Sequence, residues 1–150
     1  MKDRHVLIAV DQSDFSKKAV MYAADFLGGN PGFRATLIHI VLVPPEDYFE
    51  SDAARAGWIE EEHSKAEAML ERYRDVLFHS GFEKNKVSTV VDIRHTGSVG
   101  DCILDTQKKL GCCTVILGRR GISKKEEFLY GSTSNKVLHS GKNCAVWVIE

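Results

Sequence analysis

The sequence predicts an α/β fold built on an open parallel β-sheet with helices on both faces. Two observations lead to this class: short apolar, β-branched runs recur along the chain, and segments with helical spacing of apolar residues separate them. Strands that alternate with helices form parallel sheets that helices cover on both sides. The length of 150 residues fits one domain spanning residues 1–150, and the apolar share of 43% is ordinary for a soluble globular protein.

The first strand and the first helix are expected at the start of the chain. Residues 6–10 are a continuous apolar run, which is typical of a strand at the centre of a parallel sheet. Residues 11–14, Asp-Gln-Ser-Asp, include helix-capping side chains, and the helix after them should end at Gly28-Gly29. The apolar residues at helical spacing in this helix are Ala19, Val20, Ala23, Phe26 and Leu27.

The second strand is expected at residues 35–43, and Pro44-Pro45 ends it. Residues 47–57 are polar and irregular, so we expect a surface loop there. A long helix should follow and end near Gly81. Its apolar face should contain Ile59, Ala66, Met69, Leu70, Tyr73, Val76 and Leu77.

Three further strands and two further helices complete the expected sheet. Residues 86–93 alternate and are β-branched, which predicts the third strand, and residues 101–110 form the third helix with Ile103 and Leu104 inward. The apolar run at residues 114–117 predicts the fourth strand. A helix that includes Val137 and Leu138 follows, and residues 145–149 form the fifth strand.

A glycine-rich stretch lies between the fourth strand and the last helix. Its spacing is G-x2-G-x9-G-[ST], with glycines at positions 118, 121 and 131. Glycine lets the backbone come close to a ligand, and the hydroxyl residues at positions 132–134 favour a helix start, where N–H groups bind anions. The stretch therefore predicts a phosphate site. For any one of these glycines taken alone, a simple turn is the open alternative.

The motif and its place between a buried strand and a helix resemble the nucleotide-binding universal stress proteins, and the resemblance extends from Val6 to Ile149. It implies a Rossmann-like sheet of the adenine nucleotide alpha hydrolase type, with strand order 3-2-1-4-5. In that order the carboxyl ends of the first and fourth strands border a crevice where ligands bind. The resemblance assigns to an adenine nucleotide the residues Ala9, Asp11, Ile40, Leu117, Gly118, Arg120, Gly121, Gly131, Ser132, Thr133 and Ser134.

Two of the residues near the crevice have structural alternatives. Asp11 is suited to a ribose hydroxyl or to a metal, and equally to capping the first helix. His39, beside Ile40, is more often packed in a core than bound to a ligand. The chain also departs from the family pattern in three places, at Cys113, at Gly97-Ser98-Val99 and at Cys144-Ala145.

The resemblance implies an ATP-binding stress-response or signalling protein, in which AMP and ADP share the adenine and ribose contacts and Mg²⁺ bridges phosphates. The sequence contains no G-x4-G-K-[ST] loop and no nucleophile spaced to a base, so we expect no catalytic residues and at most slow ATP hydrolysis or autophosphorylation. One alternative is a dimeric adaptor that binds no nucleotide. Another is a KH-like RNA-binding module, because residues 118–121 also fit a basic G-x-x-G loop.

The composition bounds the partners and the compartment. A net charge of −1 gives no general attraction for nucleic acid or anionic lipid, and no apolar run approaches the ~18 residues of a membrane helix. We expect a cytoplasmic protein without a signal peptide. The four cysteines form no C-x2-C pair, and a redox role for Cys112 and Cys113 stays open. Relatives pair their last strand across a two-fold axis, which implies a homodimer through residues 145–149; the sequence names no signalling partner.

Overall fold

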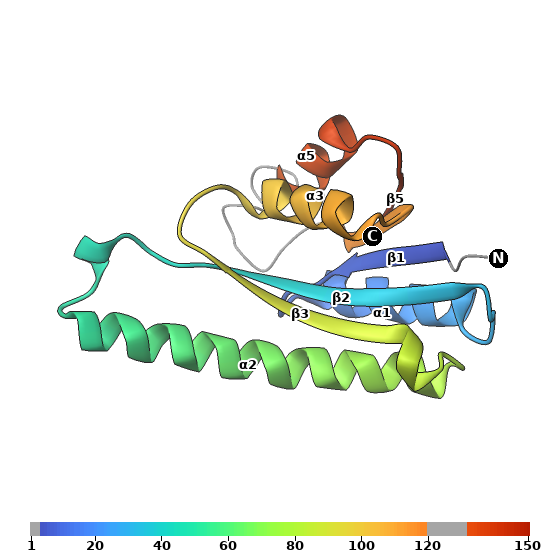
Figure 1. Cartoon of the computed structure of the whole chain (residues 1–150), viewed down its shortest axis with the longest axis horizontal. Helices are drawn as coiled ribbons and strands as arrows, with labels where there is room; N and C mark the ends of the chain where they lie inside the picture. Colours follow the sequence, from blue (N-terminus) through green and yellow to red (C-terminus); the bar gives the residue numbers. More distant parts are fainter. Residues whose placement is uncertain (1–3, 120–131) are drawn as a thin grey trace.

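The computed structural model describes residues 4–119 and 132–150, of Ser132 the backbone alone, and shows a five-stranded parallel sheet between two layers of helices (Figure 1). The strand order is β3-β2-β1-β4-β5, which confirms the expected order. The elements are β1 (Arg4–Ala9), α1 (Asp14–Leu27), β2 (Phe33–Leu42), α2 (Asp52–His79), β3 (Val87–Arg94), α3 (Val99–Leu110), β4 (Thr114–Gly118), α5 (Ser132–Ser140) and β5 (Ala145–Ile149), with short 3₁₀ turns η1 (Glu46–Tyr48) and η2 (Lys84–Lys86).

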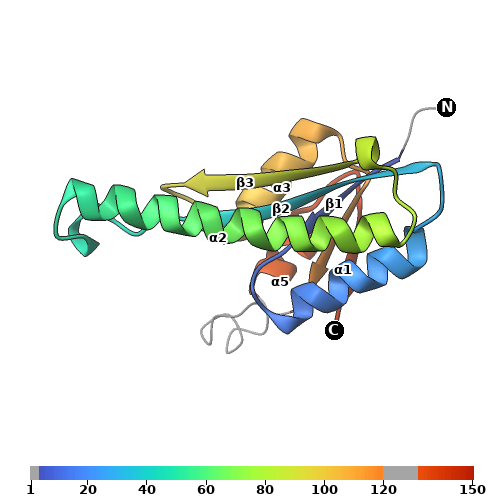
Figure 2. The same cartoon turned by 90° about the horizontal axis from the view of Figure 1, so that it is seen from below.

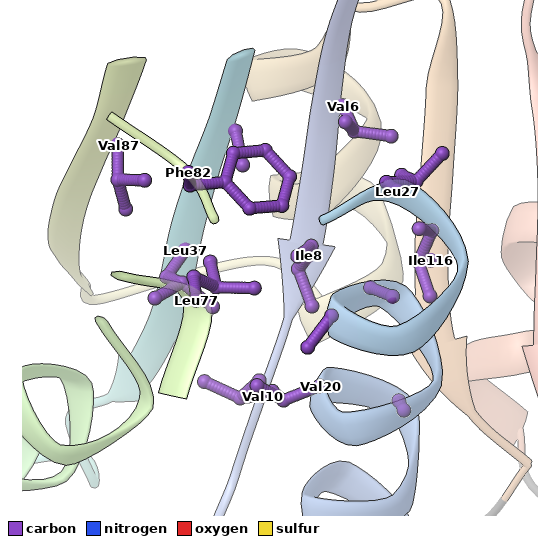
Figure 3. Packing of buried hydrophobic residues seen from close by; sticks show 14 of the residues in the cluster. Val6, Ile8, Val10, Val20, Leu27, Leu37, Leu77, Phe82, Val87 and Ile116 are labelled. Atoms are coloured by element: carbon purple, nitrogen blue, oxygen red, sulfur yellow. The ribbon is translucent and has the colours of Figure 1, made fainter. Parts of the chain in front are cut away.

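Both faces of the sheet are buried. α1 and α2 lie side by side on one face (Figure 2), and α3 and α5 cover the other. Side chains of β1 alternate between the two layers, as the strand period of two requires: Val6 and Ile8 pack toward α1 and α2, whereas Leu7 points toward α3 and α5. Figure 3 shows the first of these clusters, where Ile8 lies among side chains of β2, β4 and α1. Burial on both faces explains why residues 6–10 are continuously apolar.

The sheet register brings the carboxyl ends of three strands together. β1 pairs with β2 on one side and with β4 on the other, so that Ala9 lies beside both Ile38 and Leu117. The chain leaves β1 toward β2 and later returns to the other side of β1 as β4. At such a reversal of strand order the two connections diverge and leave room between them.

The prediction of a surface loop at residues 47–57 is wrong for residues 52–57, which are helical. α2 begins at Asp52, and the hydroxyl of Ser51 caps it by accepting the N–H of Ala54 at 3.0 Å. The helical pattern was missed because this part of α2 buries no side chain fully; the first fully buried residue of the helix is Ala66. Among the helices in the described part of the chain, α2 included, none has both the length and the apolar content to cross a membrane.

Phe26 is one of the apolar residues at helical spacing in α1, but it does not lie on the buried face of that helix. Its side chain is 65% exposed, and the stripe that faces the sheet consists mostly of small residues that let the helix approach closely. The Phe26 ring stacks on Tyr22 with 5.8 Å between centroids and contacts Trp147 of β5 edge-on at 5.4 Å. Leu138 of α5 is likewise 52% exposed, beside the buried Val137.

Candidate functional site

An open cavity lies at the carboxyl ends of β1 and β4, with about 560 Å³ of empty space that includes solvent at its mouth. Its walls come from both sides of the strand-order reversal and from the first turns of three helices, α1, α3 and α5. Sequence segments that are more than a hundred residues apart therefore meet at one place. The lining residues are Ala9, Val10, Asp11, Ser16, His39, Ile40, Val99, Ile103, Leu117, Gly118, Arg119, Thr133 and Ser134.

Most of the residues singled out in the sequence lie at this cavity. Seven of them line it, and Ser132 begins α5 at its edge. Arg120, Gly121 and Gly131 lie outside the described residues. The seven are Ala9, Asp11, Ile40, Leu117, Gly118, Thr133 and Ser134.

One wall of the cavity is apolar. Ile40 of β2 and Leu117 of β4 flank Ala9 at the end of β1, and each of the three is at most 8% exposed. From α3, Val99 and Ile103 add aliphatic surface on the same side of the sheet. A wall of aliphatic side chains fits a flat, weakly polar ring, because apolar contact and exclusion of water favour such a ligand.

Asp11 occupies the turn between β1 and α1. Its Oδ1 atom accepts the backbone N–H of Ser13 at 2.8 Å and the hydroxyl of Ser16 at 2.9 Å. Ser13, and not Asp11, caps α1, since its hydroxyl accepts the N–H of Ser16 at 3.2 Å. The alternative that Asp11 caps the first helix is therefore wrong, and the bonds from Ser13 and Ser16 instead hold its carboxylate at the cavity wall.

The first turn of α5 forms the polar side of the cavity. The hydroxyl of Ser134 donates to the carbonyl oxygen of Arg119 at 2.9 Å and so ties the helix to the end of β4. Thr133 lies beside it on the lining. N–H groups in the first turn of an α-helix have no partner within the helix, and together with the helix dipole they favour anions.

Arg119 of the lining and Lys136 of α5 each form an ion pair. The guanidinium of Arg119 pairs with the carboxylate of Glu150, while its backbone N–H donates to Ile149 at 2.8 Å. Lys136 of α5 lies 3.5 Å from Asp101 of α3. The hydroxyl of Ser98, followed by the charge of Lys136, lowers the pKa of the Asp101 carboxyl below its usual range, so this acid stays ionised.

His39 lines the cavity although the sequence favoured simple packing. Its Nδ1 atom lies 2.7 Å from the carbonyl oxygen of Val10. A carbonyl oxygen accepts only, so Nδ1 carries the hydrogen of this bond. The histidine therefore joins β2 to the end of β1 and has both roles, a packed side chain and part of the wall.

Sequence reasoning missed several residues of the lining. Ile103 was predicted to face inward, which is correct, but its place beside a cavity depends on where α3 begins. Val99 lies at a departure from the family pattern, and Ser98 caps α3 there with a 3.2 Å bond from the N–H of Asp101. Ser16 gave no sequence signal. Within residues 4–119 and 132–150, no three His, Cys, Asp or Glu side chains are grouped in a way that would hold a metal ion.

The comparisons with known proteins agree with this architecture. The profile of the universal stress protein family matches residues 3–150. The universal stress protein Sll1388 of Synechocystis is 24% identical over 151 residues, which cover 97% of this chain and 96% of the relative. Among solved structures, the universal stress protein UspA from Lactobacillus plantarum has a TM-score of 0.79 at 18% identity, and the match covers 100% of this chain and 99% of that one.

A second solved structure is that of the universal stress protein from Archaeoglobus fulgidus in complex with dAMP. It is 18% identical, the match covers 100% of each chain, and the TM-score is 0.70. At such identities the structures establish a shared fold, and the family profile, which spans nearly the whole sequence, establishes the relationship. The chain belongs to the universal stress protein family.

Proposed function

We propose that this protein binds ATP in the cavity between β1 and β4 and acts as a cytoplasmic stress-response or signalling module. The observation that carries the proposal is the convergence of three chemically different surfaces on one cavity. An aliphatic wall, the carboxylate of Asp11 and the first turn of α5 match in turn a base, a sugar and a phosphate chain.

Each surface has a proposed partner. The adenine ring lies against Ile40 and Leu117, with Ala9 beneath it. The carboxylate of Asp11 accepts a hydrogen bond from a ribose hydroxyl. The N–H groups and hydroxyls of Thr133 and Ser134 meet the phosphates.

The glycine motif supplies the remaining phosphate contacts in this proposal. Gly118, Arg120, Gly121, Gly131 and Ser132 belong to it. The dAMP held by the relative from Archaeoglobus fulgidus supports an adenine nucleotide as the class of ligand. AMP and ADP share the base and sugar contacts with ATP, so the number of phosphates is the point to be tested.

Magnesium in this proposal is bound mainly by phosphate oxygens and water, as is usual for nucleotide-bound Mg²⁺. Asp11 contributes a carboxylate to the lining and is already engaged with Ser13 and Ser16. Fast phosphoryl transfer requires a positioned nucleophile and groups that stabilise charge in the transition state. We therefore propose at most slow hydrolysis or autophosphorylation.

We also propose a homodimer through β5. This strand lies at the edge of the sheet and pairs with β4 alone within the described chain, so one row of its backbone groups is available to a second strand. Trp147 of this strand contacts the exposed rings of Tyr22 and Phe26. An exposed aromatic cluster beside an open strand edge supports a protein contact there.

Two other functions have less support from the structure. A KH loop joins two helices, whereas Gly118 ends strand β4, so RNA binding through residues 118–121 is not proposed. An adaptor without nucleotide is the remaining competitor. Mass spectrometry of the denatured protein after purification, followed by titration with ATP, ADP and AMP, distinguishes the two functions. Nucleotide that is carried through purification or bound in the titration supports the proposal. If neither is observed, the adaptor function is the one that remains.

A further inference from the structure

Three of the four cysteines gather at the end of the sheet that is opposite to the cavity. Cys112 and Cys113 immediately precede β4, and Cys144 immediately precedes β5. The cavity lies at the carboxyl ends of strands, whereas these thiols lie at the amino ends of two neighbouring strands. The proposed nucleotide site uses none of them.

Cys113 and Cys144 occupy neighbouring positions immediately before the paired strands β4 and β5. Thr114 pairs with Ala145 in the parallel register, and each cysteine is the residue before one member of this pair. The N–H of Ala145 donates to the carbonyl oxygen of Cys113 at 2.8 Å, so the backbones are still in contact at the cysteines. Neighbouring strands lie about 4.8 Å apart, within the ~4.4–6.8 Å between Cα atoms that a disulfide spans.

The three thiols differ in exposure and in acidity. Cys113 is exposed, Cys144 is half-buried and Cys112 is only 2% exposed. Burial raises the pKa of the Cys112 thiol to about 11, and the nearby Cys113 and Cys144 contribute further. Burial and then Cys113 also raise the pKa of Cys144. Cys113 is therefore the thiol that a reagent in solution meets first, and Cys112 stays protonated and protected.

We propose that Cys113 and Cys144 form a reversible oxidation site, in which a hydroperoxide converts the two thiols into an intramolecular disulfide. The Cys113 thiolate attacks one peroxide oxygen, the O–O bond breaks, and Cys113 becomes a sulfenic acid while water (or an alcohol) leaves. The sulfur of Cys144 then attacks the Cys113 sulfur and displaces the hydroxyl group as a second water. The two thiols lose two electrons and two protons in total, and the peroxide takes up both.

Cys112 is the competing partner and is less suited. Its side chain is packed in the cluster beneath α3 and α5, so a bond to Cys113 would require it to leave the core. The proposed bond instead joins β4 to the edge strand β5 without moving a fully buried side chain. Because it forms away from the cavity, ATP affinity should be equal in the reduced and oxidised protein.

The test is peroxide treatment of the folded 150-residue chain, followed by alkylation in denaturant and digestion with trypsin. Cleavage after Lys109, Arg119 and Lys142 places the two thiols in separate peptides, residues 110–119 and 143–150. We expect these peptides to be cross-linked after oxidation and separate after treatment with dithiothreitol. Two of the four cysteines should lose their alkylation.

Three single variants identify the sulfur atoms. Cys113→Ser should abolish the cross-link, Cys144→Ser should leave Cys113 as a sulfenic acid that dimedone traps, and Cys112→Ser should cross-link as the wild type does. Alkylation of all four cysteines after peroxide would overturn the proposal, as would a cross-link that persists in Cys113→Ser or one that joins two chains on a non-reducing gel. The result is independent of nucleotide binding, so failure of one proposal leaves the other intact.

Discussion

Gly118 at the end of β4 faces Phe15 in the first turn of α1 so closely that no side chain fits between them. A β-carbon on Gly118 would lie 2.7 Å from the Cβ atom of Phe15 and 2.8 Å from its carbonyl carbon. The contact lets α1 start directly against the sheet, beside the turn that holds Asp11. The packing of α1 is therefore one reason for glycine at this position, besides any contact with a ligand.

Gly118→Ala should destabilise the protein. Inserting a methyl group into a well-packed contact typically costs about 1–3 kcal/mol, and here backbone atoms of Phe15 have to shift. Denaturant unfolding measures the change. Gly57→Ala is the matched control: nothing lies within 4 Å of the added carbon, and alanine inside helix α2 should stabilise by roughly 0.5–1 kcal/mol. Equal effects of the two variants would show that Phe15 does not constrain Gly118.

Asp11→Asn separates ligand binding from folding. The amide oxygen can still accept the bonds from Ser13 and Ser16, so the unfolding midpoint should change little. ATP affinity should fall by about tenfold or more, because hydrogen bonds to charged groups contribute roughly 1.5–3 kcal/mol. Calorimetry on both proteins checks this. Unchanged affinity would remove Asp11 from the proposed ribose contact.

The sequence predicted the sheet well because its strands are buried on both faces. Residues 6–10 and 114–117 are continuous apolar runs for this reason, and their pattern needs no tertiary information. The start of α2 at Asp52 was missed because an exposed helical segment has no apolar stripe by which the sequence would indicate a helix. The helical spacing of Phe26 did not reveal its exposure, because the ring packs sideways on Trp147, which is 121 positions later in the chain.

The candidate site was predictable only in part. Asp11 follows β1 closely and Gly118 ends β4, and the strand order then brings them to one cavity. The contributions of Val99 and Ser16 depend on where α3 and α1 begin, which the caps at Ser98 and Ser13 decide. Helix starts shift by a residue or two without a clear sequence signal.

His5 should make stability depend on pH on the acid side. Burial, followed by the charge of Arg34, lowers the pKa of His5 below 6.5, and its Nε2 atom lies 2.7 Å from the hydroxyl of Thr36. The unfolded chain therefore binds a proton at a pH at which the folded protein resists it. The free energy of unfolding should fall as the pH drops through 6.5 and below.

His5→Gln provides the comparison, since glutamine keeps a hydrogen-bonding side chain without titrating. Denaturant unfolding at pH values on either side of 6.5 should show a smaller loss for the variant than for the wild type. Parallel pH profiles for the two proteins would mean that His5 does not cause the dependence.

Phe26→Ser should weaken the proposed dimer. The ring is 65% exposed and contacts Trp147 on the edge strand, so its removal takes apolar area from the proposed interface with little effect on the core. A sizing column with light scattering should show a shift from dimer toward monomer. Tyr48→Ser is the control, because Tyr48 is 68% exposed but lies in η1, away from β5. A shift in both variants, or in neither, would place the interface elsewhere.

The central claim is that the cavity between β1 and β4 binds ATP, and calorimetric titration with ATP and Mg²⁺ tests it most directly. We expect micromolar binding by the wild type and by Gly57→Ala. In Gly131→Val, which adds a branched side chain within the glycine motif, binding should be lost while the circular dichroism spectrum stays unchanged. No heat of binding in the wild type, together with no nucleotide released on denaturation, would contradict the claim.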